Sequence, residues 1–420
     1  MPCLRRGVVR RSMKICMISH AFPPEKLGGA EVYARRISRA LARQGHKVIV
    51  ITHRPFAGVS SLFPRAETRD GLVFYRFYPW NIFSIYSAQK RPAALKALWR
   101  LIDLVNPIPA LCACRILRKE RPYIVHAHIT HGFSALILLR LIKKLRIPLV
   151  QTIHSYGLYC LRCDLLRPSG KLCRRLPLFC RAFAKIAGAI ANKAVYLAIS
   201  PSQFCLAQHL NNGLFTYIKK AVLPNPVEMP ESMPQKRPQG VFSVLFAGRL
   251  TKNKGAHILI EAFQMLAAPQ ARLIIAGEGP RGNKLRRQAK NDPRISFVGK
   301  LAEQGLFALY ARSSITVVPS LYYEPFGNVI IESFAAGTPV LASRIGGMPE
   351  IAQDGFNGHL FTPGKVDELK ALLERLMREP EQLKILGKNA FACAQNYSLE
   401  KHVAALEKIY LGAKDVYPGS

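Results

Sequence analysis

The sequence predicts an α/β protein built from two doubly wound, Rossmann-like domains that face each other across a cleft. At 420 residues, 49% of them hydrophobic, the chain is too long for one ordinary core and can fill two. Short continuous apolar runs alternate with amphipathic stretches, a pattern typical of parallel strands covered by helices on both faces. A proline-rich segment between residues 224 and 240 interrupts the alternation, which then starts again.

The first half of the chain contains five apolar runs of strand length, and a Gly28-Gly29 turn separates the first strand from the first helix. We expect strands at residues 14–18, 47–52, 123–127, 148–153 and 195–199, and a helix at residues 31–44. In the second half, strands are expected at residues 241–247, 272–276, 295–298, 315–319, 339–342 and 359–361. A helix is expected at residues 254–266, and two helices, at 366–378 and 399–411, close the chain.

These elements divide the chain into an amino-terminal domain at residues 1–225, a linker at 226–240 and a second domain at 241–397. The last segment, residues 398–420, is expected to pack back on the first domain. Ligands of doubly wound sheets bind outside the carboxyl ends of the strands, so the space between the domains is the expected site.

The charge is strongly one-sided. Of the 61 basic and 25 acidic residues, residues 1–240 hold 39 and 9, a net +30, and the remainder hold 22 and 16, a net +6. Such a field suits phosphates, an anionic membrane surface or nucleic acid. Residues 90–121 and 140–146 mix cations with Leu, Ile and Trp99, as in helices that lie on anionic lipid, although ordinary solvated helix faces would look the same.

No apolar run approaches the roughly 20 residues of a membrane span. The basic start, residues 1–11, is followed by an apolar run too short for a signal peptide. Ten cysteines at irregular positions and no export signal favour a reducing cytoplasm.

Two segments combine glycine or cations with a strand-to-helix turn. Gly28 and Gly29 would let backbone N–H groups approach a phosphate at a helix N-terminus. Arg249 and Lys254 offer a planar donor fork and a point charge, which together suit a diphosphate. Each segment also has a plain interpretation, as a simple turn and as two solvated cations.

The most specific segment runs from Tyr323 to Glu332, with the sequence Tyr-Glu-Pro-Phe-Gly-Asn-Val-Ile-Ile-Glu. It joins an expected strand to a helix, whose free N–H groups at residues 326–329 would point at an anion. Glu324 would lie at the end of the strand and Glu332 about two turns along the helix, where carboxylates can accept hydrogen bonds from sugar hydroxyls. A capping glutamate and a second, exposed one would not account for the Pro-Phe-Gly-Asn between them.

In type, spacing and order, these segments resemble glycosyltransferase family 4, the retaining glycosyltransferases of the GT-B fold. The resemblance runs from about residue 14 to residue 410. The family's paired glutamates match Glu324 and Glu332, and the other matching motifs are Gly28–Glu31, His126–His128, Ser200–Phe204, Gly248-Arg249, Lys254-Gly255, Gly277–Pro280, Gly346–Glu350 and Asn357-Gly358.

The resemblance implies a role for each matching position. Arg249 and Lys254 would bind the diphosphate of a UDP-, GDP- or ADP-sugar, aided by the backbone of Gly29. Glu332 would hold the ribose, Glu324 would contact the transferred sugar, and Val298 would lie near the base. The backbone after Pro325 would help to bind sugar and phosphate, through Phe326, Gly327, Asn328 and Val329. Family members require no metal cofactor, and the chain contains no Asp-X-Asp pair.

His126 and His128 lie two residues apart, on the same side of an expected strand. Both could be structural, and the resemblance favours His128 as the one near the anomeric carbon. Retention would follow from front-face attack, with the leaving phosphate taking the acceptor's proton. We therefore assign no general base, and Glu324 as a nucleophile is the less favoured option.

The acceptor side is expected at the loop that begins at His154. Its form resembles that of family members that build surface polysaccharides, such as lipopolysaccharide. Cys160, Cys163, Cys173 and Cys180 supply four sulfurs within 21 residues, enough for tetrahedral zinc, but the spacing of the second pair is not that of a standard zinc knuckle. Free thiols are the favoured interpretation, with no metal.

Together these features predict a retaining hexosyltransferase acting on a lipid-linked or cell-envelope glycan, bound peripherally to the inner face of the cytoplasmic membrane. A nucleotide-sugar epimerase would isomerise its sugar without an acceptor, and a phosphorylase would need free phosphate; both could share the fold. A basic nucleic-acid-binding protein would leave the diphosphate motifs unexplained, and no nucleic-acid module is recognised, so nucleic acid is not expected as a partner.

Overall fold

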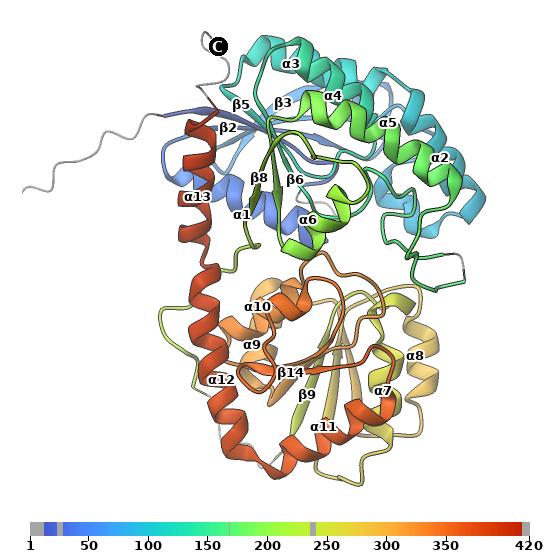
Figure 1. Ribbon diagram of the computed structural model, residues 1–420, viewed down its shortest axis with the longest axis vertical. Helices are drawn as coiled ribbons and strands as arrows, with labels where there is room; N and C mark the ends of the chain where they lie inside the picture. Colours follow the sequence, from blue (N-terminus) through green and yellow to red (C-terminus); the bar gives the residue numbers. More distant parts are fainter. Residues whose placement is uncertain (1–11, 23–27, 168, 236–240, 414–420) are drawn as a thin grey trace, which may run out of the picture.

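The computed structural model describes residues 12–22, 28–167, 169–235 and 241–413. It has two α/β domains placed one above the other along the long axis of the molecule, each with its own sheet (Figure 1). This arrangement confirms the predicted fold class. The basic residues 1–11, Pro168 of the cysteine-rich loop, the last five residues of the expected linker and residues 414–420 lie outside the described residues.

In the described part of the chain, the first sheet has eight strands in the order β3-β4-β2-β1-β5-β6-β7-β8, and only β3 runs antiparallel to its neighbour. The strands are β1 (Lys14–Ile18), β2 (Lys47–His53), β3 (Arg65–Arg69), β4 (Leu72–Phe77), β5 (Ile124–Ala127), β6 (Leu149–Thr152), β7 (Leu197–Ser200) and β8 (Lys219–Val222). The helices are α1 (Gly29–Arg43), α2 (Ala93–Val105), α3 (Ile108–Glu120), α4 (Ala135–Lys144), α5 (Leu178–Ala194) and α6 (Gln203–Leu210), with 3-10 turns η1 (Val59–Leu62) and η2 (Ile85–Lys90).

The second sheet, over the same described residues, has six parallel strands in the order β11-β10-β9-β12-β13-β14. They are β9 (Ser243–Ala247), β10 (Arg272–Ala276), β11 (Ile295–Gly299), β12 (Ile315–Val318), β13 (Val340–Ser343) and β14 (Gly358–Phe361). The remaining elements are α7 (Ala256–Gln264), α8 (Gly282–Gln288), α9 (Glu303–Arg312), α10 (Asn328–Ala335), α11 (Val366–Arg378), α12 (Pro380–Ala394) and α13 (Leu399–Leu411), with η3 (Lys252–Lys254), η4 (Met348–Glu350) and η5 (Gln395–Tyr397).

The central strands of each sheet are buried on both faces, as the continuous apolar runs require. Along β1, Cys16 and Ile18 face the core that holds α3, α4 and α5, whereas Ile15 and Met17 face the core that holds α1 and α13. The strand order reverses between β1 and β5 in the first sheet and between β9 and β12 in the second. Those reversals are where doubly wound sheets bind ligands.

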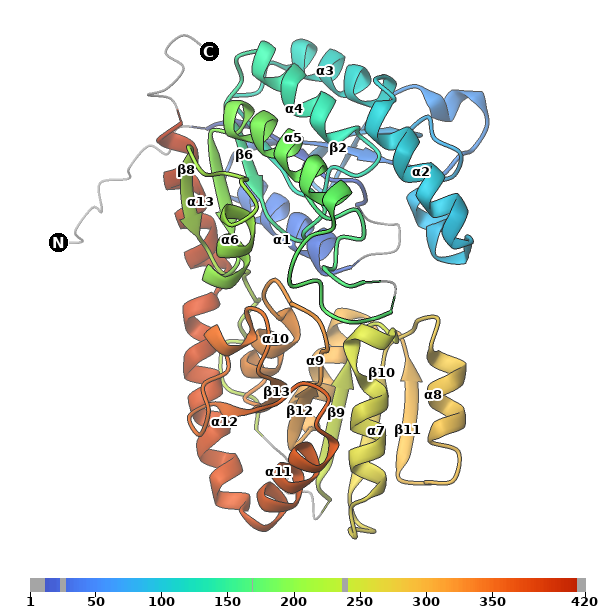
Figure 2. The same ribbon diagram turned by 45° about the vertical axis from the view of Figure 1, so that its right-hand side comes forward.

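The end of the chain crosses from one domain to the other. Helices α12 and α13 follow each other along one side of the molecule, α12 beside the second domain and α13 beside the first (Figures 1 and 2). The Tyr410 hydroxyl lies 2.6 Å from His126 Nδ1, which ties α13 to β5. The linker between the two domains runs alongside the segment that joins α12 to α13, because the N–H of Val227 in the linker donates to Tyr397 O at 2.8 Å. The two connections between the domains are therefore hydrogen-bonded to each other.

The two expected closing helices are confirmed as α11 and α13, but a further helix, α12, lies between them, because Pro380 ends α11 and begins α12. The helix expected from residue 254 begins at Ala256, after a 3-10 turn and Gly255, whose φ is 74°. A Cβ at Gly255 would lie 1.7 Å from Pro319 O, so only glycine fits. Lys254 consequently lies at the end of the 3-10 turn η3 and not in the helix.

We predict that Tyr410→Phe destabilises the protein by about 1–2 kcal/mol, because it removes a buried hydrogen bond between α13 and the sheet. Urea unfolding followed by circular dichroism measures the change. Tyr217→Phe, at a side chain that is 86% exposed, is the matched control and should leave the midpoint unchanged. Equal midpoints for the wild type and Tyr410→Phe would contradict the prediction.

Candidate functional site

The predicted site residues follow the carboxyl ends of central strands in both sheets. In the first domain, Gly29 follows β1, His128 follows β5 and His154 follows β6, and these three strands are neighbours. In the second, Arg249 follows β9 and Glu324 follows β12, which also pair. Parallel pairing places residues distant in sequence at one edge of each sheet.

Buried Glu324 and partly exposed Lys254 form an ion pair at the centre of the second domain's edge. Lys254 Nζ lies 2.5 Å from Glu324 Oε1, which also accepts a hydrogen bond from Ser320 at 2.8 Å. The Tyr322 hydroxyl donates to Glu324 Oε2 at 2.7 Å. Burial alone would lower the pKa of Lys254, but the Glu324 carboxylate outweighs it and raises that pKa. Sequence reasoning missed Ser320 and Tyr322, although both lie within four residues of Glu324.

The Gly346-Gly347 pair supports the backbone around Glu324. Gly346 has a φ of 66°, and a Cβ there would lie 2.4 Å from Glu324 O. The N–H of Gly347 donates to the same carbonyl at 2.8 Å. This motif therefore has a physical reason: its glycines let the loop after β13 pack directly against the loop that carries the glutamate.

Glu332 lies on α10, between the two domains. The Tyr310 hydroxyl donates to Glu332 Oε2 at 3.1 Å, and Arg36 Nη1 of α1 lies 4.0 Å from Glu332 Oε1. Burial raises the pKa of Glu332, and Arg36 and Tyr310 oppose that rise. Arg35 forms a further ion pair with Glu303 of α9. Helix α1 thus contacts carboxylates of the second domain along its cationic side.

The first turns of α1 and α10 meet. A Cβ at Gly29 would lie 2.9 Å from Asn328 Nδ2, and Asn225 donates to Asn328 Oδ1 at 2.7 Å. Gly327, with a φ of 119°, precedes α10, Phe326 is buried and Val329 is partly buried. Each helix N-terminus carries a partial positive charge, so their convergence favours an anion between them.

The loop before α1 is held by Glu31. Its carboxylate accepts the Gly28 N–H at 2.8 Å and contacts His20 Nε2 at 3.1 Å. Burial would raise the pKa of Glu31, but these two partners outweigh it and lower the pKa to about 2. Glu31 is therefore ionised and orients the Gly28-Gly29 turn.

The two histidines of the His126–His128 motif have different surroundings. His126 Nδ1 lies 2.6 Å from Tyr410, and its Nε2 lies 2.6 Å from Thr152, so both ring nitrogens have partners. His128 Nδ1 lies 3.2 Å from His154 Nε2, while its own Nε2 is buried without a partner among the described residues. Burial lowers the pKa of His128, and it lowers that of His154 to about 4. Both line a cavity of about 30 Å³, room for about one water molecule.

A contact between motifs of the two domains went unrecognised in the sequence. The Glu350 carboxylate accepts the backbone N–H groups of Gln203 and Phe204 at 2.8 and 2.7 Å, at the start of α6. Ser202 Oγ donates to Pro325 O at 2.5 Å. The Ser200–Phe204 and Gly346–Glu350 motifs thus meet across the domain boundary, beside the loop of Glu324.

The remaining predicted residues take no part in these contacts. Arg249 is exposed and makes no ion pair within the described ranges. Val298 is exposed on the edge strand β11. The cysteines at 160, 163, 173 and 180 are free thiols, and the described part of the chain contains no group of three side chains able to hold a metal ion.

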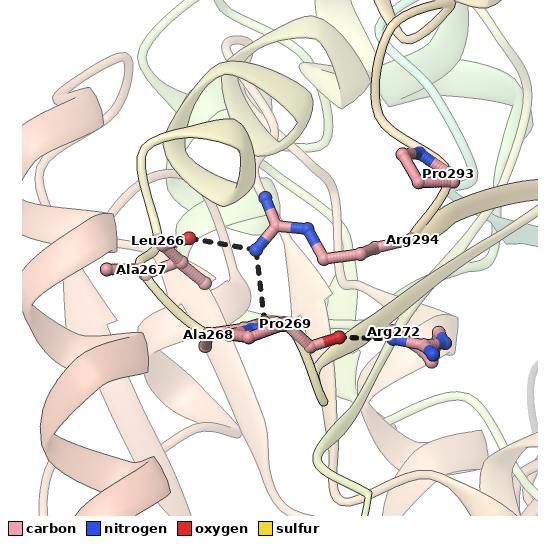
Figure 3. Close-up of a pocket in the computed structure, with 7 residues that line it drawn as sticks. All are labelled: Leu266, Ala267, Ala268, Pro269, Arg272, Pro293 and Arg294. Atoms are coloured by element: carbon pink, nitrogen blue, oxygen red, sulfur yellow. Dashed lines mark hydrogen bonds between the residues drawn. The ribbon is translucent and has the colours of Figure 1, made fainter.

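A hollow of about 500 Å³ lies at the opposite end of the second sheet (Figure 3). Its walls include Leu266, Ala268, Arg272 and Arg294, where β10 and β11 begin. Arg294 donates to Leu266 O at 2.8 Å and to Ala268 O at 3.1 Å, and Arg272 donates to Pro269 O at 2.7 Å. These arginines hold the turn together, and the hollow lies away from the predicted site residues.

Two family models match almost the whole chain. One, described as glycosyl transferases group 1, matches residues 230–392, and the other, described as a glycosyl transferase 4-like domain, matches residues 28–225. The fold and these matches define a glycosyltransferase of the GT-B class. The chain belongs to glycosyltransferase family 4, as the sequence motifs indicated.

Similar proteins span nearly the same length. The chain is 28% identical to a glycogen synthase of Mycobacterium tuberculosis, over 96% of this chain and 95% of that protein. It is 29% identical to an MMP α-(1→4)-mannosyltransferase of Mycolicibacterium hassiacum, over 90% and 92%. The structure of Anabaena HepE in complex with UDP is similar, with a TM-score of 0.71 and 22% identity over 95% of this chain and all of that one.

We predict that acid destabilises the fold partly through His402, which links α13 to Tyr33 and to Pro224 O. Burial lowers its pKa from 6.5 to about 4, so as the pH falls the unfolded chain takes up the proton first. Stability present above pH 6.5 is therefore lost between pH 6.5 and 4, and by pH 5 the loss is about 2 kcal/mol. Urea unfolding at pH 7.5 and pH 5 should show a smaller loss in His402→Gln than in the wild type. Parallel losses would contradict the assignment.

Proposed function

We propose that this glycosyltransferase is a retaining hexosyltransferase that uses a nucleotide-diphosphate sugar, with UDP as the first candidate, and an acceptor glycan carried at a membrane. The observation that carries the proposal is the Lys254–Glu324 pair beside the converging starts of α1 and α10. This arrangement places cations and helix N-termini, which suit a diphosphate, next to carboxylates, which suit the hydroxyl groups of a sugar. UDP is favoured because HepE, a structural neighbour, was solved with it.

The donor would bind to Lys254 and Glu324, which otherwise form an ion pair with each other. A diphosphate draws the ammonium of Lys254 and the exposed guanidinium of Arg249, while the Gly29 backbone borders the same space. Lys254 then leaves Glu324, whose carboxylate is free to accept a sugar hydroxyl. Glu332, held by Tyr310 at the domain boundary, would receive the ribose hydroxyls, and the turn at Phe326–Val329 would border the phosphate. Val298 would lie near the base.

In the transfer step, the acceptor hydroxyl oxygen bonds to the anomeric carbon as the bond from that carbon to the diphosphate oxygen breaks on the same face. The acceptor proton passes to the leaving phosphate oxygen, which needs no base from the protein. Lys254 and Arg249 stabilise the negative charge that grows on the diphosphate, and that task does not require a metal ion. Neutral His128 would lie close to the anomeric carbon, and His154 would border the acceptor.

The charge distribution supports a membrane-borne acceptor. The acceptor half carries a net +30, against +6 in the donor half. A field this one-sided attracts anionic lipid more than it helps one small donor. The enzyme would therefore work on a lipid-linked or cell-envelope glycan, bound peripherally to the inner face of the cytoplasmic membrane.

The function is tested by offering UDP-, GDP- and ADP-hexoses to the purified protein, first for binding and slow hydrolysis and then for transfer to membrane extract. One nucleotide sugar should be hydrolysed without added metal, and its hexose should appear in extract lipid with the anomeric configuration retained. Isomerisation without an acceptor would indicate an epimerase, and dependence on free phosphate a phosphorylase. Unchanged turnover in both Arg249→Ala and Glu324→Ala would overturn the site.

We predict that Lys254→Ala lowers kcat for donor hydrolysis on the order of 100-fold, because it removes a cation that stabilises the leaving diphosphate. Lys252→Ala, at an exposed lysine in the same 3-10 turn, is the matched control and should stay within about twofold of wild type because a solvated charge contributes little. Thermal unfolding of both variants separates lost chemistry from lost folding. Equal rates for the two variants would refute the role of Lys254.

A further inference from the structure

Helix α2 carries a stripe of exposed apolar side chains. Leu98, Leu101 and Val105 are 46%, 54% and 73% exposed, and Leu95, one turn earlier, is exposed as well. Their spacing of three or four residues places them along one side of the helix. Ile108 and Leu111, also exposed, extend the stripe onto α3. Patches of this kind mark interaction surfaces.

The opposite side of α2 is firmly attached to the domain. Trp99 is buried, and its indole N–H donates to Phe83 O at 2.8 Å. Asp103 is also buried and accepts the N–H of Ser134 at 3.0 Å. The expectation that Trp99 belongs to the lipid-facing surface was therefore wrong, because Trp99 anchors the helix. The stripe is held outward by these contacts and cannot turn inward without breaking them.

Exposed cations lie near both ends of the stripe in the described part of the chain. Arg91 is exposed just before α2, Lys96 is exposed in the first turns of α2, and Arg115, Arg118 and Lys119 are exposed on the side of α3 that carries Ile108 and Leu111. The two acidic residues of this stretch are engaged elsewhere, Asp103 with Ser134 and Glu120 with Tyr75 at 2.5 Å. The start of α5, on the same side of the domain, repeats the combination with exposed Leu178 and Phe179 and exposed Arg174, Arg175 and Arg181 (Figures 1 and 2).

Helix α2 also reaches the expected acceptor pocket. Arg100 Nη1 lies 2.9 Å from His131 Nδ1, and Nη2 donates to Cys163 Sγ at 2.8 Å. His131 lines the same small cavity as His128 and His154. One helix therefore has an apolar side facing outward and a side chain in contact with the wall of the pocket.

We propose that the exposed side of α2, with Leu98, Leu101 and Val105 at its centre, docks the protein on an anionic phospholipid bilayer. The apolar side chains enter the headgroup boundary, and the surrounding cations bind lipid phosphates. Docking through α2 sets the acceptor pocket at the lipid surface, where a lipid-linked glycan presents its reactive end. The inference rests on the proposed membrane-borne acceptor and specifies the surface that meets it.

The chemistry of the surface favours a bilayer over other partners. Two copies of the chain meeting through this face would bring like charges together without acidic residues to offset them. A nucleic acid would pair with the cations but would leave the leucines uncovered. In the part of the chain that the structure describes, no single helix is long and apolar enough to cross a membrane, and the bent pair Ala94–Val105 and Ile108–Glu120 meets that test only jointly. The α3 half of this pair packs Ala113 and Leu117 into the domain core.

The test is binding of the full chain to vesicles of phosphatidylcholine with 30% phosphatidylglycerol, on the order of a typical anionic leaflet. The variant changes Leu98, Leu101 and Val105 to Gln together, and the control changes exposed Met265, Ile385 and Leu411 to Gln. We expect the α2 variant to partition at least about tenfold more weakly, with the control as wild type, because each buried methylene adds to membrane affinity. Binding should also weaken at high salt and on vesicles without phosphatidylglycerol.

Vesicle binding needs no turnover, so it can be judged apart from the proposed function. Donor hydrolysis in solution should be unchanged in the α2 variant, while transfer to lipid in membrane extract falls with vesicle binding. Equal vesicle binding by the α2 variant and wild type would overturn the proposal. So would a dimer that the α2 variant abolishes, or binding to duplex DNA in preference to vesicles. Strong α2-dependent vesicle binding without any sugar transfer would retain the docking surface and discard the proposed function.

Discussion

The meeting of the first turns of α1 and α10 is the constraint on which the rest of the site depends. Gly29 and Asn328 approach so closely that a single added methyl group would press on the Asn328 amide. Two positive helix ends brought together in this way repel each other unless an anion lies between them. The glycines of both turns, the carboxylate of Glu31 and the interdomain bond of Asn225 hold the two ends in place.

The Lys254–Glu324 pair can stabilise the site and still be replaced by contacts to a ligand. Leaving the buried carboxylate of Glu324 without a partner would be costly, so the partly exposed Lys254 stabilises it. A ligand that offers a phosphate to one and a hydroxyl to the other can replace the pair without leaving a charge unpartnered. Ser320, Tyr322 and Gly346 hold the glutamate and its backbone in position, so the exchange need not disturb the loop.

The two domains divide the remaining work by charge. The second domain carries a small net charge, whereas the positive excess of the first is spread over helices that face outward. Its outer helix α2 joins that charge to exposed leucines and, through Arg100, to the wall of the expected acceptor pocket. The expectation of a lipid surface at residues 140–146 fits less well, because α4 turns Leu139 and Ile142 into the core and leaves only its solvated cations outside.

The sequence by itself determined the fold class and the motif residues, because continuous apolar runs mark buried parallel strands and the glutamate-containing turn is too specific for chance. It did not reveal β3, β4 and β8: the exposed edge strands β3 and β8 have no continuous apolar run, and the apolar run of the buried strand β4 was overlooked. Only the tertiary structure decided which partner each polar group takes: Glu350 with the start of α6, Tyr310 with Glu332, and Tyr410 with His126. It also turned Trp99 inward and three neighbouring apolar side chains outward on one helix. The local hydrophobic pattern determines where helices and strands form. Which polar groups pair across long sequence distances depends on how the sheets and domains pack, and the local pattern does not contain that information.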